Sequence, residues 1–352
     1  MTFADSAQPN FRFTRVGVAL KPNDATTERL GVLNPACARL RDGSLHIYPR
    51  MVAPGNISRI GSFRAWDLPD GNIQVEQVGF ALEPEAPYEL RDRPGGYGCE
   101  DPRVTFIPAL DRYVMAYVAL GPRGPEVAVA VSRDGLAWER LGLVHFEGSS
   151  EEIADKDAAF FPEPVRSPSG VESLAFYHRP TLNIPFDDRE QAIKYLESLS
   201  PEEREGIALG YVPLDAVRDD IHNLCKVAET HRLTIPAANW GAIKVGAGTP
   251  PVRIREGWLA VIHGVDELKS DERGTLLRYC AGIMIHDAER IESVIYRSKD
   301  PLFAPEEAGE IHGTVDQVVF PTGIDPRAER VFDIYYGMAD YEIGRGCLTL
   351  SP

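Results

Sequence analysis

Two adjacent acids and a base occupy a turn that directly precedes an apolar stretch: Glu100, Asp101 and Arg103, with Pro102 between them. The proline fixes its own φ and restricts the conformation of the residue before it, so the turn would hold the Asp101 carboxyl in a defined direction. A carboxyl group held at the entry of a strand could act as a general acid. Taken alone, the motif is more typical of a turn with solvated acids.

A second set of side chains could bind an anion. Its members are cationic or imidazole side chains that are expected in separate blades of a strongly acidic chain: Lys156, Arg179, Lys244 and His263. Each one alone is more typical of a solvated or salt-bridged residue. Guanidinium and ammonium groups hold phosphate through charge-assisted hydrogen bonds, so four such groups around one channel favour a phosphate site.

A repeated β-structure is expected to position these residues. A hairpin pattern, in which a proline-marked apolar strand turns and returns through a β-rich strand, recurs in residues 34–50, 100–119, 157–180, 248–265 and 319–340. Repeats of this kind, about 60 to 70 residues apart except across one longer gap, are typical of propeller blades. We therefore predict an all-β fold, a five-bladed β-propeller forming a single domain over residues 1–352, whose strand ends converge on one channel.

Further strands are expected after most hairpins, at residues 126–132, 206–212 and 279–285. Short, evenly spaced strands joined by Gly, Pro and Asp turns favour antiparallel sheets over alternating β and α elements. The turn from Ser132 to Trp138 resembles the Asp-box hairpin of sialidases but departs from its spacing. It is interpreted as a structural turn.

An insertion at about residues 183–236 explains the longer gap. Ile193, Leu196 and Leu199 recur at helical spacing, and Ser200 followed by Pro201 is typical of a new helix start. One or two short amphipathic helices are predicted here. They would be either a solvated decoration or a lid or oligomer contact, and a homo-oligomer is one possible assembly.

Composition restricts the class of function. The 352 residues carry a formal net charge of -16, which argues against sequence-independent binding to nucleic acid or to an anionic membrane surface. The five cysteines are scattered and lack C-x-x-C spacing, so we expect reduced thiols and no zinc site. No signal-like segment or membrane-length apolar run is found, which predicts a cytoplasmic, soluble protein. No His/Asp/Glu grouping has metal-ligand spacing, and no metal or cofactor is expected.

Eight stretches together resemble glycoside hydrolase family 130, the β-mannoside phosphorylases and related mannosidases. The resemblance extends from about Asn34 to Asp340 and rests on NISRIGSFRA, GCEDPR, DKDAAFFPE, FYHRP, KVGAGTPP, WLAVIHGV, VVFPTG and YYGMAD. The family fold is a five-bladed β-propeller, in agreement with the repeat count. Two departures are the insertion after Pro180 and Tyr341, where many relatives have a small polar residue.

The resemblance implies roles for particular residues. It places the acid catalyst on Asp101, and it implies phosphate as co-substrate, bound by Lys156, Arg179, Lys244 and His263. Residues of the S-R-I-G motif and of equivalent strand ends complete a predicted substrate-binding set: Arg50, Asn56, Ser58, Arg59, Asp157, Tyr336 and Asp340. Hydrolytic family members tend to lack the basic set, so its presence favours phosphorolysis.

The leading hypothesis is an inverting phosphorylase that converts β-linked manno-oligosaccharides and phosphate to α-mannose 1-phosphate and a shortened sugar. Phosphate is already an anionic nucleophile, so one acid and a cationic pocket suffice. A β-mannosidase is the alternative within the family, and an inverting hydrolase needs a second carboxylate as base. Glu100, Glu163 or Asp340 would have to supply it.

A third hypothesis belongs to a different class of function. In a non-catalytic sugar-binding propeller, Asp101 would only form a hydrogen bond, and the aromatic rings of Tyr97, Trp240 and Trp258 would stack on sugars. Those rings are more typical of core or rim residues. Phosphate-dependent turnover distinguishes the three hypotheses.

Overall fold

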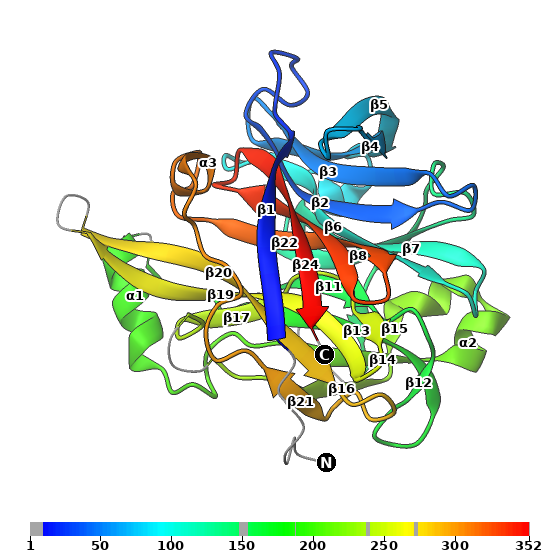
Figure 1. Cartoon of the computed structure of the whole chain (residues 1–352). Helices are drawn as coiled ribbons and strands as arrows, with labels where there is room; N and C mark the ends of the chain where they lie inside the picture. The colour runs from blue at the N-terminus through cyan, green and yellow to red at the C-terminus, as the bar shows by residue number, and fades with distance from the viewer. Residues whose placement is uncertain (1–9, 148–153, 187, 237–239, 271–273, 352) are drawn as a thin grey trace.

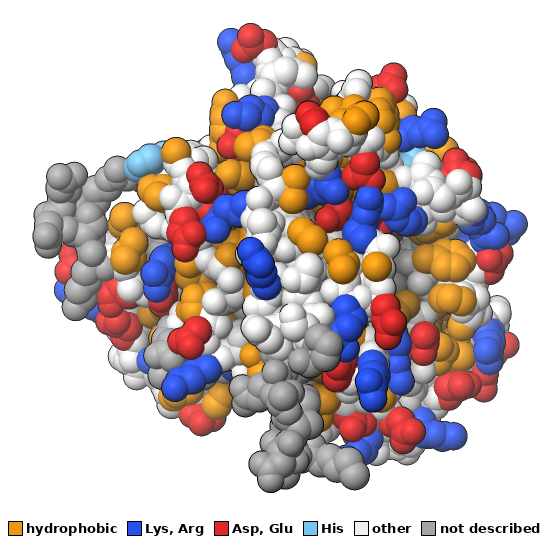
Figure 2. Space-filling model, viewed as in Figure 1, with side chains coloured by type: hydrophobic (Ala, Val, Ile, Leu, Met, Phe, Trp, Pro, Cys, Tyr) orange, Lys and Arg blue, Asp and Glu red, His pale blue; other side chains and the backbone are white. Residues whose placement is uncertain are grey.

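The computed structural model describes residues 10–147, 154–186, 188–236, 240–270 and 274–351. Antiparallel sheets are arranged around a common centre, and the few helices lie outside them (Figure 1). On the face shown in Figure 2, acidic and basic side chains are interspersed. Within the described ranges, every helix is too short or too polar to cross a bilayer.

The described strands group into five blades of four main strands each, as the repeat count predicts, and a short parallel pairing joins the sheets of blades 1 and 2. Blade 1 contains β2 (Gly31–Arg39), β3 (Leu45–Ala53), β4 (Ile57–Asp67) and β5 (Ile73–Leu82). Blade 2 contains β6 (Tyr97–Ile107), β7 (Arg112–Gly121), β8 (Gly124–Ser132) and β9 (Glu139–Leu143). Blade 3 contains β11 (Asp155–Phe160), β13 (Glu172–Pro180), β14 (Ala208–Pro213) and β16 (Glu229–Arg232). Blade 4 contains β17 (Lys244–Ala247), β19 (Gly257–Ser270), β20 (Gly274–His286) and β21 (Val294–Arg297).

Blade 5 closes the ring with strands from both ends of the described chain. It contains β22 (Val319–Ala328), β23 (Val331–Met338), β24 (Glu342–Ser351) and β1 (Asn10–Leu20). β1 runs antiparallel to β24, and the two lie side by side in Figure 1. Shorter strands are β10 (His145–Phe146), β12 (Val165–Arg166), β15 (Lys226–Val227) and β18 (Val252–Ile254). The first and last strands therefore share one sheet.

The apolar core lies in layers between neighbouring blades. Blades 2 and 3 pack through Val114, Val129, Phe160 and Phe176, for example, all with at most 1% of their surface exposed. Similar clusters separate the other pairs of blades. Trp240 and Trp258 are also buried, in the layer between blades 3 and 4. These two rings are core residues and are not available to stack on a sugar.

The helices occupy the periphery and the insertion. They are η1 (Pro87–Glu89), α1 (Arg189–Ser198), α2 (Leu214–Asp219), η2 (Ile221–Cys225) and α3 (Ala308–Ile311). The predicted helical spacing is confirmed for Ile193 and Leu196, which are buried; Leu196 packs against Ile243 and Val265. No second helix starts at Ser200 among the described residues. Residues 201–203 form a turn instead, closed by the Glu203 N–H donating to the Ser200 carbonyl (3.0 Å).

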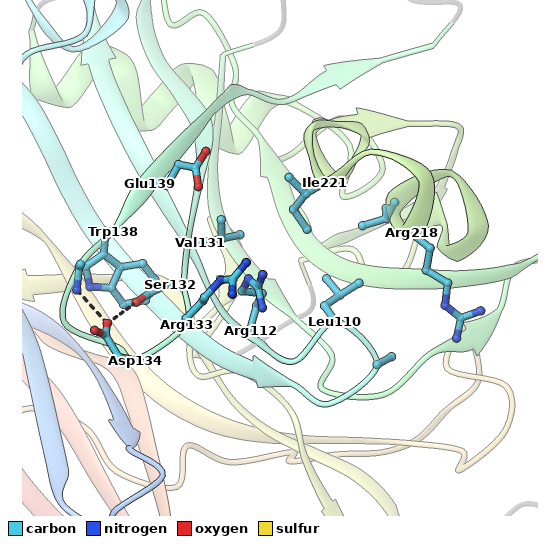
Figure 3. A pocket seen from close by; sticks show the side chains of 13 residues that line it. Leu110, Arg112, Val131, Ser132, Arg133, Asp134, Trp138, Glu139, Arg218 and Ile221 are labelled. Atoms are coloured by element: carbon cyan, nitrogen blue, oxygen red, sulfur yellow. Dashed lines mark hydrogen bonds between the residues drawn. The ribbon is translucent and has the colours of Figure 1, made fainter.

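The Asp-box-like turn between β8 and β9 has a structural role. Asp134 Oδ1 accepts hydrogen bonds from the N–H groups of Leu136 (2.8 Å) and Ala137 (3.0 Å), while Ser132 Oγ accepts one from Gly135 (2.8 Å). Figure 3 shows this turn at the edge of a groove of about 740 Å³ whose other side is formed by α2 and η2. The aspartate satisfies backbone donors, as predicted for a structural turn.

Candidate active site

A cavity of about 220 Å³ lies where the blades converge. All five blades, or the segments that join them, contribute to its lining: Asn34, Arg50, Asp101, Lys156, Asp157, Arg179, Lys244, Tyr279, Val315, Val318, Phe320 and Asp340. The predicted acid, three of the four predicted phosphate ligands and three of the predicted substrate contacts are therefore brought together. The sequence-based expectation that equivalent strand ends meet at one channel is confirmed for these residues.

Backbone irregularities aim three polar side chains at this cavity. Asn34, Asp101 and Asp157 have positive φ values of 43°, 47° and 59°. Each lies at a break in register in the first strand of its blade, β2, β6 and β11 respectively. A β-bulge re-aims a side chain, and Asn and Asp are the residues other than glycine that best tolerate a left-handed conformation. The same local device is thus used in three successive blades.

Asp101 accepts hydrogen bonds from two side chains of blade 1. Asn34 Nδ2 donates to Asp101 Oδ1 over 2.9 Å, and Arg50 Nη1 lies 3.3 Å from the same oxygen. Burial alone would raise the pKa of this carboxyl, but the charges of Arg50 and Arg103 and the Asn34 hydrogen bond outweigh it, so the pKa of Asp101 lies below its usual value. The carboxyl of Asp101 is therefore ionised at neutral pH.

Arg50 is held in place by two further groups. Its Nη2 donates to Glu100 Oε1 (2.6 Å), and its Nε donates to Ser58 Oγ (3.0 Å). The Ser58 hydroxyl in turn donates to Glu100 (3.2 Å). Glu100 and Ser58 therefore act on Asp101 through the guanidinium between them. Glu100 is consequently unsuited to be a free general base.

Asp157 forms a buried ionic cluster with two arginines. Arg179 Nε donates to Asp157 Oδ2 over 2.6 Å, and Arg103 Nη2 lies 3.4 Å from Oδ1. Burial opposes ionisation, but Arg179, His263 and Arg103 together hold the pKa of Asp157 far below its usual value. Arg179 also pairs with Glu205. Both Asp157 oxygens are engaged, and the Arg179 guanidinium already has two acidic partners.

His263, a predicted phosphate ligand, does not line the cavity. Its ring is fully buried, with Nδ1 donating to the Ala247 carbonyl (3.1 Å) and Nε2 3.7 Å from Asp157 Oδ2. Burial lowers the pKa of His263 to about 3. The charges of Arg179, Arg103 and Lys244 act in the same direction, and the charge of Asp157 acts against them. The imidazole is therefore neutral at physiological pH, and its predicted contact with phosphate stays a prediction.

Two lysines supply the available positive charge. Among the described residues that line the cavity, Lys156 and Lys244 are the cations whose ammonium groups have no ion pair. Lys244 Nζ lies 5.4 Å from the centre of the Tyr279 ring, a cation–π distance. An ammonium group without a carboxylate partner keeps its full attraction for a mobile anion. The two lysines are the best-placed anion ligands of the predicted set.

Tyr336 is a correction to the predicted substrate set. Its ring is 2% exposed and lies in the core layer between blades 4 and 5, 5.1 Å from the ring of Phe303. Its hydroxyl donates to Glu310 Oε1 (3.0 Å). The side chain points into the core because residues alternate across β23, so Tyr336 serves packing and not sugar contact.

Neighbouring residues of the S-R-I-G segment point to opposite faces of β4. Ser58 supports Arg50, whereas Arg59 points elsewhere, with its Nε 3.5 Å from Glu83 and its guanidinium over the Phe80 ring. Asn56 is exposed and donates to the Gly95 carbonyl (3.1 Å). Arg59 and Asn56 are outside the set of cavity-lining residues. Their predicted contacts with sugar stay predictions.

Sequence reasoning missed several cavity residues. Asn34 was assigned only as the start of the first repeat, although its proline aligns with the one after Asp101. That alignment could have identified it as the partner of the acid. Phe320, Tyr279 and Val315 form apolar walls. Single apolar residues at strand ends carry no sequence signal that distinguishes them from core residues.

Comparisons with known proteins assign the family. A family model described as β-1,4-mannooligosaccharide phosphorylase, of glycoside hydrolase family 130, matches residues 8–192 and 214–351. The chain belongs to this family. The resemblance to this family, which was predicted from the sequence motifs, is thereby confirmed. Residues 193–213, which the family model does not match, fall inside the predicted insertion.

Individual family members show similarity over most of the chain. A 1,2-β-oligomannan phosphorylase from Thermoanaerobacter sp. is 26% identical over 92% of each chain. A β-1,4-mannooligosaccharide phosphorylase from Ruminococcus albus is 36% identical over 65% of this chain and 75% of its own. The structure of a β-1,2-mannobiose phosphorylase from Listeria innocua matches with a TM-score of 0.70 at 20% identity, covering 96% of each chain. The propeller fold is thus confirmed.

We expect Asp157→Asn to destabilise the protein by about 3–5 kcal/mol, because it leaves buried guanidinium charge without its counter-ion. The folded-state pKa of Asp157 lies below its unfolded value. Its contribution is therefore present above a pH of about 4 and is lost as pH falls further. Urea unfolding at pH 7 measures the difference. Glu190→Gln, which removes one member of an exposed pair with Lys194, is the control and should leave the unfolding midpoint unchanged.

Proposed function

We propose that the protein is an inverting β-mannoside phosphorylase. The observation that carries the proposal is one cavity of about 220 Å³ that holds Asp101 together with Lys156 and Lys244, two lysines without an ion pair to any described residue. The family assignment and the names of the curated relatives support the same activity. β-Linked manno-oligosaccharide and inorganic phosphate are the corresponding substrates.

In the proposed reaction, phosphate attacks the anomeric carbon directly. Lys156 and Lys244 bind the phosphate and offset its repulsion by the nearby carboxylates, while the acid opposite protonates the departing oxygen. Phe320 and Val315 provide apolar surface against which a sugar ring can pack. Arg179 and Asp157, which both line the cavity, hold each other in place through their ion pair.

A hydrolase would need a base that activates water, and two of the three candidates for that role are poorly suited. Glu100 is held by Arg50 and Ser58. Glu163 is exposed and does not line the cavity. Asp340 does line it, and burial, with Asp101 and Glu100 nearby and only partial relief from Arg50, raises its pKa to about 6, a value suited to a general base. Phosphorolysis is favoured over hydrolysis by the two lysines of the cavity, which a phosphorylase needs and a hydrolase does not.

The proposal includes a location in the cytoplasm. All five cysteines are free thiols, and Cys37, Cys99, Cys225 and Cys280 are buried. Burial raises the pKa of each of these four thiols and keeps it in the unreactive protonated form. Free thiols are typical of proteins in a reducing compartment.

Asp101→Asn should keep the fold and lower kcat at least about a hundredfold, because an amide cannot donate the proton that a carboxyl group supplies. Steady-state phosphorolysis and reverse synthesis measure the effect. Asp111→Asn is the matched control, since Asp111 also has a positive φ (52°) but lies in an exposed turn. Near-normal turnover by folded Asp101→Asn in both directions would refute the assignment.

Lys244→Met should raise the KM for phosphate about 10- to 100-fold and the KM for the mannoside much less, because a charge-assisted bond to the anion is lost. The control is Lys226→Met, at an exposed position on β15. Equal increases in both Michaelis constants, or activity indifferent to phosphate, would contradict the phosphate site.

Stereochemistry tests the mechanism. A single displacement by phosphate inverts the anomeric centre, so the first product should be α-mannose 1-phosphate. Proton NMR of early product identifies the anomer. β-Mannose 1-phosphate would require a nucleophilic carboxylate and a double displacement. Free mannose as the sole product would indicate a hydrolase, and binding without turnover would indicate a sugar-binding protein.

A further inference from the structure

Three carboxyl groups surround one guanidinium at the cavity wall. Arg50 contacts Glu100 (2.6 Å) and Asp101 (3.3 Å), and its charge also acts on Asp340. Glu100 accepts hydrogen bonds from Arg50 and Ser58, and Asp101 accepts them from Asn34 and Arg50. The donors of this cluster are thus directed to two of the three acids.

Asp340 is the acid that lacks a donor. No hydrogen bond or ion pair reaches its carboxyl from any residue in the described part of the chain. Asp340 lies in the turn between β23 and β24, where Ala339 and Asp340 both have positive φ (46° and 53°), and this turn places the side chain in the cavity. Paired positive φ values define a tight hairpin turn, so the position is fixed by the backbone.

The charged surroundings of Asp340 come from several elements. Arg50 on β3 and Lys156 on β11 favour its ionisation, while Glu100 and Asp101 on β6 oppose it. Arg179 and Lys244 also line the cavity, and the segment before β22 contributes the apolar Val315 and Val318. Burial is the largest influence and raises the pKa of Asp340 to about 6. The opposite holds for Asp101, whose pKa is lowered.

An acid catalyst has to carry a proton when the substrate arrives, and Asp101 on its own does not satisfy this requirement near neutral pH. Two carboxyl groups that share one site resist simultaneous ionisation, so the proton remains on the one with fewer stabilising donors. In this site that group is Asp340. The pair then titrates as a unit.

We propose that Asp101 and Asp340 act as an electrostatically coupled carboxyl pair that carries one proton, with Asp340 as the group that holds it in the resting enzyme and Asp101 as the group that delivers it toward the departing oxygen. This proposal rests on the proposed phosphorolysis. It gives Asp340 a role in proton transfer in addition to any contact with sugar. It also explains how an acid held ionised by Arg50 can serve as the proton donor.

The proton count closes over one turnover. The bond between the anomeric carbon and the departing oxygen breaks with its electron pair on that oxygen, which takes the proton of the pair. A phosphate oxygen forms the new bond to the anomeric carbon. Phosphate enters as HPO₄²⁻ and leaves as a sugar phosphate dianion, so the proton that phosphate loses returns to the pair.

Infrared titration of the free enzyme tests the resting state without substrate, and so independently of the proposed reaction. A carboxyl C=O band should disappear as pH rises through about 6. The band should be lost in Asp340→Asn and retained in Asp333→Asn. Asp333 is a matched control because its carboxyl is also buried with a raised pKa, but it pairs with Arg345 (2.7 Å) outside the cavity. Persistence of the band in Asp340→Asn overturns the proposal.

Kinetics test the role in turnover. For the wild type, kcat/KM should fall as pH rises through the same range, because the protonated pair is the active form of the free enzyme. Asp340→Asn should lower kcat about a hundredfold or more and remove this fall, and Asp340→Glu should restore part of both. If Asp340→Asn raises only the KM for the mannoside and keeps the wild-type pH profile, Asp340 merely binds sugar and the proposal is wrong.

Discussion

The buried carboxylate of Asp157 is the interaction on which the site depends. It lies on blade 3 and binds Arg103 of blade 2 and Arg179 of its own blade. Arg103 also donates hydrogen bonds to the carbonyls of Ala247 and Gly248 in blade 4. Three blades are thus joined at the axis by directional charge-assisted bonds, whereas farther out they meet through apolar layers that set distance but little orientation. Cavity-lining residues from these three blades keep their relative positions because of this cluster.

Such an arrangement separates two uses of positive charge. Arg50, Arg103 and Arg179 have planar guanidinium groups that match carboxylates, and each is bonded to at least one acid. Lys156 and Lys244 have compact, mobile ammonium groups and lack such partners among the described residues. The arginines therefore build the site, and the lysines are left to meet a ligand. The four residues of the predicted anion site looked equivalent in the sequence. In the structure only the two lysines lack an acidic partner among the described residues.

The five blades could be predicted because each repeat is marked locally, by a proline, a turn and an apolar strand. Asp101 could be singled out for the same reason, since its motif is contiguous. The burial of His263 and Tyr336 could not be predicted, because the direction of a strand residue depends on register, and β22 contains a register break beside Tyr336. The helix at Arg189–Ser198 followed from apolar spacing, whereas α2 buries Leu214 and Val217 in the layer between blades 2 and 3, a contact that the sequence does not reveal.

The pairing of β1 with β24 has a consequence for how the molecule forms. Thr349 Oγ1 donates to the Arg12 carbonyl across 337 positions of sequence. Contacts this distant cannot form until nearly the whole chain has left the ribosome, and closing so long a loop carries an entropic cost that local hairpins avoid. Blades 1 to 4 can assemble during synthesis, but the ring, and with it the turn that carries Asp340, is completed last. Activity should therefore mark the end of folding, since a chain stalled before β24 lacks both the closing strand and a complete cavity.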